Sequence, residues 1–98
     1  MLVVDVEGYE RNLLDPAVTP ALKRAMMIVE VHDRAPSRAI ADALVDRFSE
    51  THVMERIVSR DRSVADYVEM RDWLPIEAAL AVSEGRPTPS LWMILTPE

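Results

Sequence analysis

The chain has 98 residues, which is enough for one small domain and too few for two. Its formal net charge of −6 at pH 7 disfavours binding to nucleic-acid phosphates, and it contains no basic run that would bind anionic membranes. No apolar run approaches the ~20 residues of a membrane span, and the absence of cysteine excludes disulfides and thiolate chemistry. We therefore expect a soluble, cytoplasmic domain.

The first predicted element is a strand over Leu2–Val6, which ends at the loop signal Glu7-Gly8. A short apolar run bounded by a turn is typical of a strand that is buried on both faces. The chain begins inside this strand. We interpret it as part of a larger α/β domain that has been cut just before a central strand.

Strands and helices alternate along the rest of the chain. Residues Glu10 to Ala25 contain a helix or two, interrupted by Pro16 and Pro20. The sequence then predicts a strand over Met26–Val31, a helix that opens at Pro36-Ser37, a strand over Val53–Ser59, a short helix over Ser63–Met70, a helix over Pro75–Glu84 and a strand over Leu91–Leu95. This alternation favours a three-layer α/β sheet whose first three strands are parallel.

Two polar clusters follow the first two strands, Asp5–Glu10 and Glu30–Asp33. Ligands of open α/β sheets bind outside the carboxyl ends of the strands, so these clusters are the candidate site. The functional interpretation is a general base, a contact to a cofactor amine, or a cation site built from Asp5 and Asp33. The structural alternative is that the acids cap helices and that Gly8 serves only the turn.

Two further polar residues have mainly structural interpretations. His52 begins a strand after a helix, at the opposite end of the sheet from the two clusters, which favours a structural role. Arg86 lies between Gly85 and Pro87 and is interpreted either as a solvated loop residue or as a partner for one of the acidic clusters.

The segment Asp5-Val6-Glu7-Gly8-Tyr9-Glu10 is similar to the Asp-x-Glu-Gly-x-Glu motif of FkbM-like S-adenosylmethionine-dependent methyltransferases. Further segments resemble the same group in the same order: Leu13-Leu14-Asp15-Pro16, Ile28-Val29-Glu30-Val31-His32-Asp33, Arg47-Phe48-Ser49-x-Thr51-His52 and Glu84-Gly85-Arg86-Pro87-x-Pro89-x-x-Trp92. The resemblance spans nearly the whole chain.

The resemblance implies a Rossmann-like three-layer sandwich with the class I sheet order 3-2-1-4-5-7-6, in which strand 7 is antiparallel. Residues 1–98 would be a single domain, the C-terminal half of that fold. They would form a half-sheet of about four strands in the order 4-5-7-6, with the last strand of the chain antiparallel. Strands 1 to 3 would be absent together with the glycine-rich motif, which agrees with a sequence whose only glycines are Gly8 and Gly85.

The same resemblance implies a methyltransferase that uses S-adenosylmethionine and acts on a small-molecule or glycan acceptor. Asp5, Glu7 and His32 would be the catalytic residues, and Asp5 would also lie beside the methionine end of the cofactor. In the related catechol O-methyltransferases, acids after strands 4 and 5 bind a divalent cation, and Asp5 and Asp33 are the matching positions here. The chain would supply the acceptor side of the site, and the missing N-terminal half would hold the cofactor.

Two alternatives remain open. The chain is either a non-catalytic interaction module that associates with itself or a divalent-cation-binding module that uses Asp5, His32 and Asp33. In a half-sheet, the strand Leu2–Val6 would be an exposed edge that is apolar apart from Asp5 and has no proline to blunt it. We therefore expect a homodimer in which two such edges meet or a swapped element covers them; otherwise the missing N-terminal half covers the edge.

Overall fold

The computed structural model describes residues 1–60, 63–83 and 89–98. The chain divides into two compact units, one formed by Met1–Val58 with Ser90–Glu98 and the other by Ser59–Pro89. The first unit contains the sheet, and the second is helical. Across the described ranges, no helix is long and apolar enough to cross a membrane.

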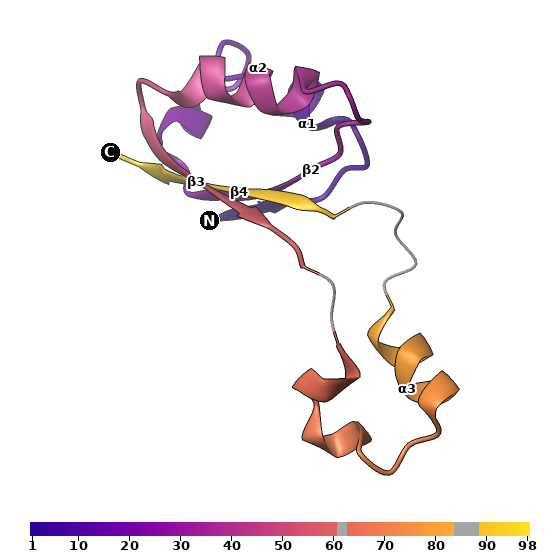
Figure 1. Ribbon diagram of the computed structural model, residues 1–98. Coiled ribbons are helices and arrows are strands. Elements are labelled where there is room, and N and C mark those ends of the chain that lie inside the picture. The colour runs from indigo at the N-terminus through magenta and orange to yellow at the C-terminus, as the bar shows by residue number, and fades with distance from the viewer. Residues whose placement is uncertain (61–62, 84–88) are drawn as a thin grey trace. The chain divides into compact units, whose positions relative to one another are not determined.

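A four-stranded mixed sheet forms the base of the first unit (Figure 1). Its strands are β1 (Leu2–Val4), β2 (Met27–Val31), β3 (His52–Val58) and β4 (Leu91–Pro97). Their order across the sheet is β1-β2-β4-β3. Strands β1 and β2 are parallel, and β4 is antiparallel to both of its neighbours. The predicted α/β class is confirmed in this form, as a small α/β fold with a mixed sheet of four strands.

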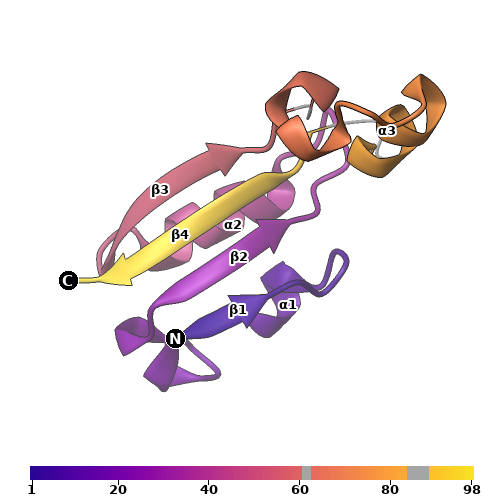
Figure 2. The same ribbon diagram turned by 90° about the horizontal axis from the view of Figure 1, so that it is seen from below.

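Helices α1 (Glu10–Leu13) and α2 (Ala39–Phe48) both lie on one face of this sheet (Figures 1 and 2). The apolar stripe of α2 faces the strands, and Leu44 and Phe48 are fully buried in a core shared with Val29 of β2. The first unit, all of whose residues are described, therefore has two layers. A third layer stays a prediction.

Arg47 of α2 holds α1 and the segment that follows it. Its guanidinium donates hydrogen bonds to the backbone carbonyls of Arg11 and Leu14. It also forms an ion pair with Asp15, with 3.5 Å between Nη2 and Oδ2. Because α1 comes directly after the turn that follows β1, these contacts also fix the position of that turn at the edge of the sheet.

Strand β1 is shorter than the sequence predicts, because the chain turns before the apolar run ends. The prediction extends the strand to Val6, whereas β1 ends at Val4. The carbonyl of Val6 accepts a hydrogen bond of 3.2 Å from the backbone N–H of Tyr9, which closes a turn. Asp5 and Val6 therefore belong to the connection between β1 and α1.

The second unit contains the 3-10 helices η2 (Val64–Asp66) and η3 (Val68–Met70), and helix α3 (Pro75–Val82). The prediction of one helix over Ser63–Met70 is wrong, because the extended backbone of Tyr67 (φ −124°, ψ 101°) separates two short 3-10 turns. Val68 of η3 is 63% exposed. The helix predicted over Pro75–Glu84 ends at Val82 in the structure, and the interpretations of Arg86 lie outside the described residues.

Candidate functional site

A tight turn after β1 carries the first polar cluster. Glu7 and Gly8 both have positive φ angles, 52° and 104°, so the backbone reverses direction over two residues. Glycine tolerates the second of these angles, which other residues rarely adopt. The turn leads directly into α1, whose first residue is Glu10, and the backbone N–H of Gly8 donates a hydrogen bond of 3.1 Å to Glu10 Oε1.

The second polar cluster lies beside the first because β1 and β2 are parallel neighbours, with Val4 opposite Val29. The carboxyl ends of the two strands therefore meet at the same edge of the sheet, as the sequence predicts. His32 follows the last residue of β2, and Glu30 lies within that strand. The structure thus joins residues of 5–10 and 30–33 in one cluster.

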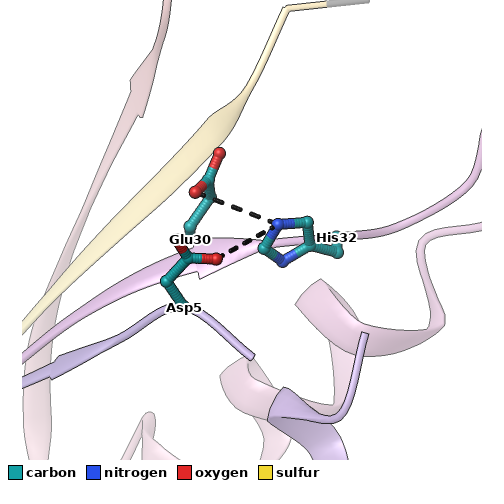
Figure 3. Close-up of side chains that lie close together, drawn as sticks. All are labelled: Asp5, Glu30 and His32. Carbon is teal, nitrogen blue, oxygen red and sulfur yellow. Dashed lines mark ion pairs between the residues drawn. The ribbon is translucent and has the colours of Figure 1, made fainter. Parts of the chain in front are cut away.

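His32 lies at the centre of this cluster, with its imidazole side chain 19% exposed. Its Nδ1 atom is 2.6 Å from Glu10 Oε1, a charge-assisted hydrogen bond in which the ring N–H donates to the carboxylate. Its Nε2 atom faces three more carboxylates, at 3.5 Å from Asp5 Oδ1, 3.6 Å from Glu7 Oε2 and 3.9 Å from Glu30 Oε2. Figure 3 shows Asp5 and Glu30 approaching the same ring nitrogen.

These carboxylates change the pKa of His32. Burial of the imidazole by itself lowers the pKa, because it disfavours the charged form. The hydrogen bond to Glu10 and the charges of Glu10, Glu7 and Glu30 act in the opposite direction and outweigh burial. The net effect raises the pKa of His32 above its ordinary value of 6.5. The cluster therefore favours a cation at the position of the ring.

Glu10 and Glu30 are the buried members of the cluster, with exposed fractions of 0% and 2%. Both belong to the two polar clusters predicted from the sequence, but no individual role is predicted for either of them. The sequence feature that could have identified Glu10 is its position two residues after Gly8, because a turn at Gly8 directs the next polar side chain back toward the sheet. Glu30 alternates with inward-facing residues of β2 and gives no comparable signal.

The carboxylate of Asp33 is occupied by the backbone of α2, whereas the predicted cation site of Asp5 and Asp33 requires it as a ligand. Its Oδ1 accepts a hydrogen bond from the backbone N–H of Ile40 and its Oδ2 accepts one from Ala41, each of 2.9 Å. These N–H groups belong to the first turn of α2 and would otherwise lack partners in the helix. Asp33 therefore caps α2, which is the structural alternative for an acid after a strand.

A cavity of about 560 Å³ opens beside the cluster. Most of its lining comes from the turn after β1, from α1 and from the loop between β2 and α2: Glu7, Gly8, Tyr9, Arg11, Asn12, His32, Asp33, Arg34, Ser37, Ala39 and Ile40. The lining combines two guanidinium groups with hydroxyl, amide and carboxylate groups. Such a cavity suits a polar small molecule that carries hydroxyl or anionic groups.

His52 does not line this cavity, and its contacts are of a different kind. It is 2% exposed, its Nε2 lies 2.9 Å from the carbonyl of Ala25, and its Nδ1 lies 2.9 Å from Thr51 Oγ1. Its ring packs edge-on against Phe48, with 5.2 Å between ring centroids. These contacts give His52 a structural role at the start of β3, as its position in the sequence indicates.

Comparisons with known proteins add no family to this description: no family model, no curated protein and no solved structure matches the chain. The chemistry of the site therefore follows from its own groups. These are one imidazole and the four carboxylates around it, next to a polar cavity.

Proposed function

We propose that this chain forms the acceptor side of a methyltransferase-type α/β domain. The observation that carries the proposal is the sheet order β1-β2-β4-β3 with an antiparallel β4. It agrees with the order 4-5-7-6 that the resemblance to FkbM-like methyltransferases implies. In that arrangement the acidic cluster after β1 and the polar cluster after β2 face the substrates.

The cluster and the cavity fit a hydroxylated acceptor. Glu7 lines the cavity and its side chain is 82% exposed, so it is the carboxylate of the cluster that a ligand there reaches first, while Asp5, 49% exposed, lies outside the lining. A carboxylate or imidazole nitrogen within hydrogen-bond reach of an acceptor hydroxyl orients its oxygen and takes up its proton. Arg11 and Arg34 in the cavity lining would bind an anionic group of the same acceptor.

The residues present do not build a pocket for S-adenosylmethionine by themselves. The sequence has glycine only at positions 8 and 85, so it offers no glycine-rich loop for the adenosine and ribose. Asp5 is the one position that the resemblance puts beside the methionine end of the cofactor. The proposal therefore assigns the chain to the acceptor and requires a glycine-rich segment from elsewhere.

A fusion experiment tests this assignment. The N-terminal segment of an FkbM-like methyltransferase, carrying strands 1 to 3, is joined to Met1, and S-adenosylmethionine binding is measured by titration calorimetry. We expect one cooperative unfolding transition and binding at least tenfold tighter than that of the N-terminal segment alone. Asp5→Asn should weaken the gain, while Asp46→Asn on the exposed side of α2 should leave it unchanged. A fusion that folds cooperatively without this gain contradicts the proposal.

A second candidate function is self-association without catalysis, and exposed apolar strands favour it. Strand β1 lies at the edge of the sheet, where Leu2 and Val3 are 42% and 65% exposed. An unblunted apolar edge pairs readily with another strand. We propose a homodimer through this edge, formed over the observed strand Leu2–Val4.

A further inference from the structure

We propose that Asp5, Glu30 and His32 form a binding site for one divalent transition-metal cation, with His32 coordinating through Nε2. The site lies where the carboxyl ends of β1 and β2 meet. The proposal goes beyond methyl transfer and does not depend on it, because it concerns groups that this chain supplies alone. It also differs from the two predicted cation sites, the pair of Asp5 and Asp33 and the set of Asp5, His32 and Asp33, since Glu30 takes the place of Asp33.

The spacing of the three side chains is the first argument. Each offers one ligand atom, and these atoms all lie within 4.8 Å of one another. His32 Nε2 is 3.5 Å from Asp5 Oδ1 and 3.9 Å from Glu30 Oε2, both too long for a hydrogen bond. Two ligands of one tetrahedral ion, with bonds of ~2.1 Å, lie ~3.4 Å apart. The observed separations are therefore close to those of a shared cation.

The orientation of the imidazole is the second argument. Glu10 accepts a hydrogen bond from Nδ1, so the hydrogen of a neutral ring lies there and the lone pair of Nε2 faces Asp5 and Glu30 (Figure 3). Histidines that ligate metals commonly donate their other ring N–H to a carboxylate, which fixes the tautomer and strengthens the ligand. Glu10 provides that carboxylate from a fully buried position.

Buried negative charge also favours a cation in this cluster. Glu10 Oε2 is buried and has no hydrogen-bond partner among the described residues. Four carboxyl groups lie within 4 Å of this one imidazole. Burying a charged group is costly unless it is paired. A divalent cation at Nε2 would add positive charge beside these carboxylates.

The composition of the site indicates the kind of metal. One imidazole nitrogen with two carboxylate oxygens suits Zn²⁺ or Mn²⁺, whereas Mg²⁺ and Ca²⁺ favour oxygen ligands alone. Glu7 Oε2, 3.6 Å from the same nitrogen on an exposed side chain, is available as a fourth ligand or as a contact to a bound water. Glu7 and His32 also line the adjacent cavity.

Paramagnetic NMR on the full chain tests the site directly. After treatment with EDTA, the chain is titrated with Mn²⁺ while the imidazole signals of its two histidines are recorded. We expect substoichiometric Mn²⁺ to broaden His32 and to spare His52. His52 is a suitable internal control because it contacts Ala25, before β2, whereas His32 follows that strand, roughly 20 Å away at ~3.3 Å per residue.

Zn²⁺ titration calorimetry on variants gives the second readout. We expect one Zn²⁺ per chain, at least tenfold weaker binding in Asp5→Asn, and unchanged binding in Asp46→Asn, which removes an equal charge from an exposed position on α2. Asp5 is half exposed, so its substitution should preserve the fold, and circular dichroism checks this. Equal broadening of both histidines, no saturable binding, or equal affinity in the two variants would overturn the proposal.

Discussion

At the scale of single residues, Asp33 is used by the fold rather than by the cluster beside it. Both of its carboxylate oxygens accept backbone hydrogen bonds of 2.9 Å from the first turn of α2. The residue at the usual capping position, Arg38, makes no side-chain capping bond. Asp33 therefore caps the N-terminus of α2 from a position before the loop. Its two hydrogen bonds connect the end of β2 to the start of α2.

We predict that Asp33→Ala lowers the free energy of unfolding by about 1–2 kcal/mol, the usual effect of losing an N-terminal cap. Urea unfolding followed by circular dichroism measures it. The matched control is Asp46→Ala on the exposed side of the same helix, for which we expect a change within about 0.5 kcal/mol. Equal losses in the two variants would mean that Asp33 does not cap α2.

The sequence predicts the membership of the cluster better than the roles of its members. Asp5, Glu7 and His32 are selected by one rule, that side chains after neighbouring parallel strands meet at one edge of the sheet. The burial of Glu10 depends on the turn that directs α1 beneath His32. The capping role of Asp33 depends on a helix that begins only after the loop. Neither role can be inferred without the tertiary positions of α1 and α2.

At the scale of elements, the connection between β1 and α1 determines whether the cluster forms. Gly8 has φ 104°, and a Cβ atom built there would meet nothing within 4 Å. A substitution is therefore opposed by the backbone conformation alone. We predict that Gly8→Ala lowers the free energy of unfolding by about 1–3 kcal/mol, the usual cost of such strain. Thermal and urea unfolding measure the effect.

The neighbouring residue provides the control for this prediction. Glu7 has φ 52°, which glycine adopts more readily than glutamate. Glu7→Gly should therefore leave the free energy of unfolding unchanged or raise it slightly, because relief of strain offsets the greater entropy of the unfolded chain. A neutral effect of Gly8→Ala would show that the turn relaxes and does not hold Glu10 in place.

The elements themselves are predicted well where hydrophobic runs are uninterrupted. The predicted strand Met26–Val31 is observed as Met27–Val31, because its β-branched and apolar residues fill the centre of the sheet. Short helical turns are predicted poorly. Residues Glu10 to Ala25 form one short helix and a 3-10 helix, and Ser63–Met70 forms two more 3-10 helices. Their periodicity is too brief to separate an α-helix from a 3-10 turn.

At the scale of the whole molecule, the first unit leaves apolar surface on one face of its sheet. Helices α1 and α2 cover the opposite face (Figure 2). On the open face, Val53 and Ile57 of β3 are 55% and 49% exposed, and Ile57 pairs in register with Trp92 of β4. Together with Val3 on the edge strand, these side chains form a surface whose burial would favour association.

We predict that the chain is a dimer at micromolar concentration through the β1 edge, as measured by sedimentation velocity. Val3→Lys should produce a monomer, because a lysine on an edge strand opposes pairing with another strand. The matched control is Val18→Lys, which places the same charge at a residue that is 80% exposed and outside the sheet. A monomeric wild-type chain would rule out the proposed dimer.

Two segments far apart in the chain, 5–10 and 30–33, surround His32 with carboxylates. An NMR titration of His32 in the metal-free chain tests this most directly. We predict that the pKa of His32 lies above 6.5 and falls in Glu10→Gln, which removes a hydrogen-bonded negative charge. Asp46→Asn should leave it unchanged. A pKa at or below 6.5, or one insensitive to Glu10→Gln, would contradict this arrangement of carboxylates around His32.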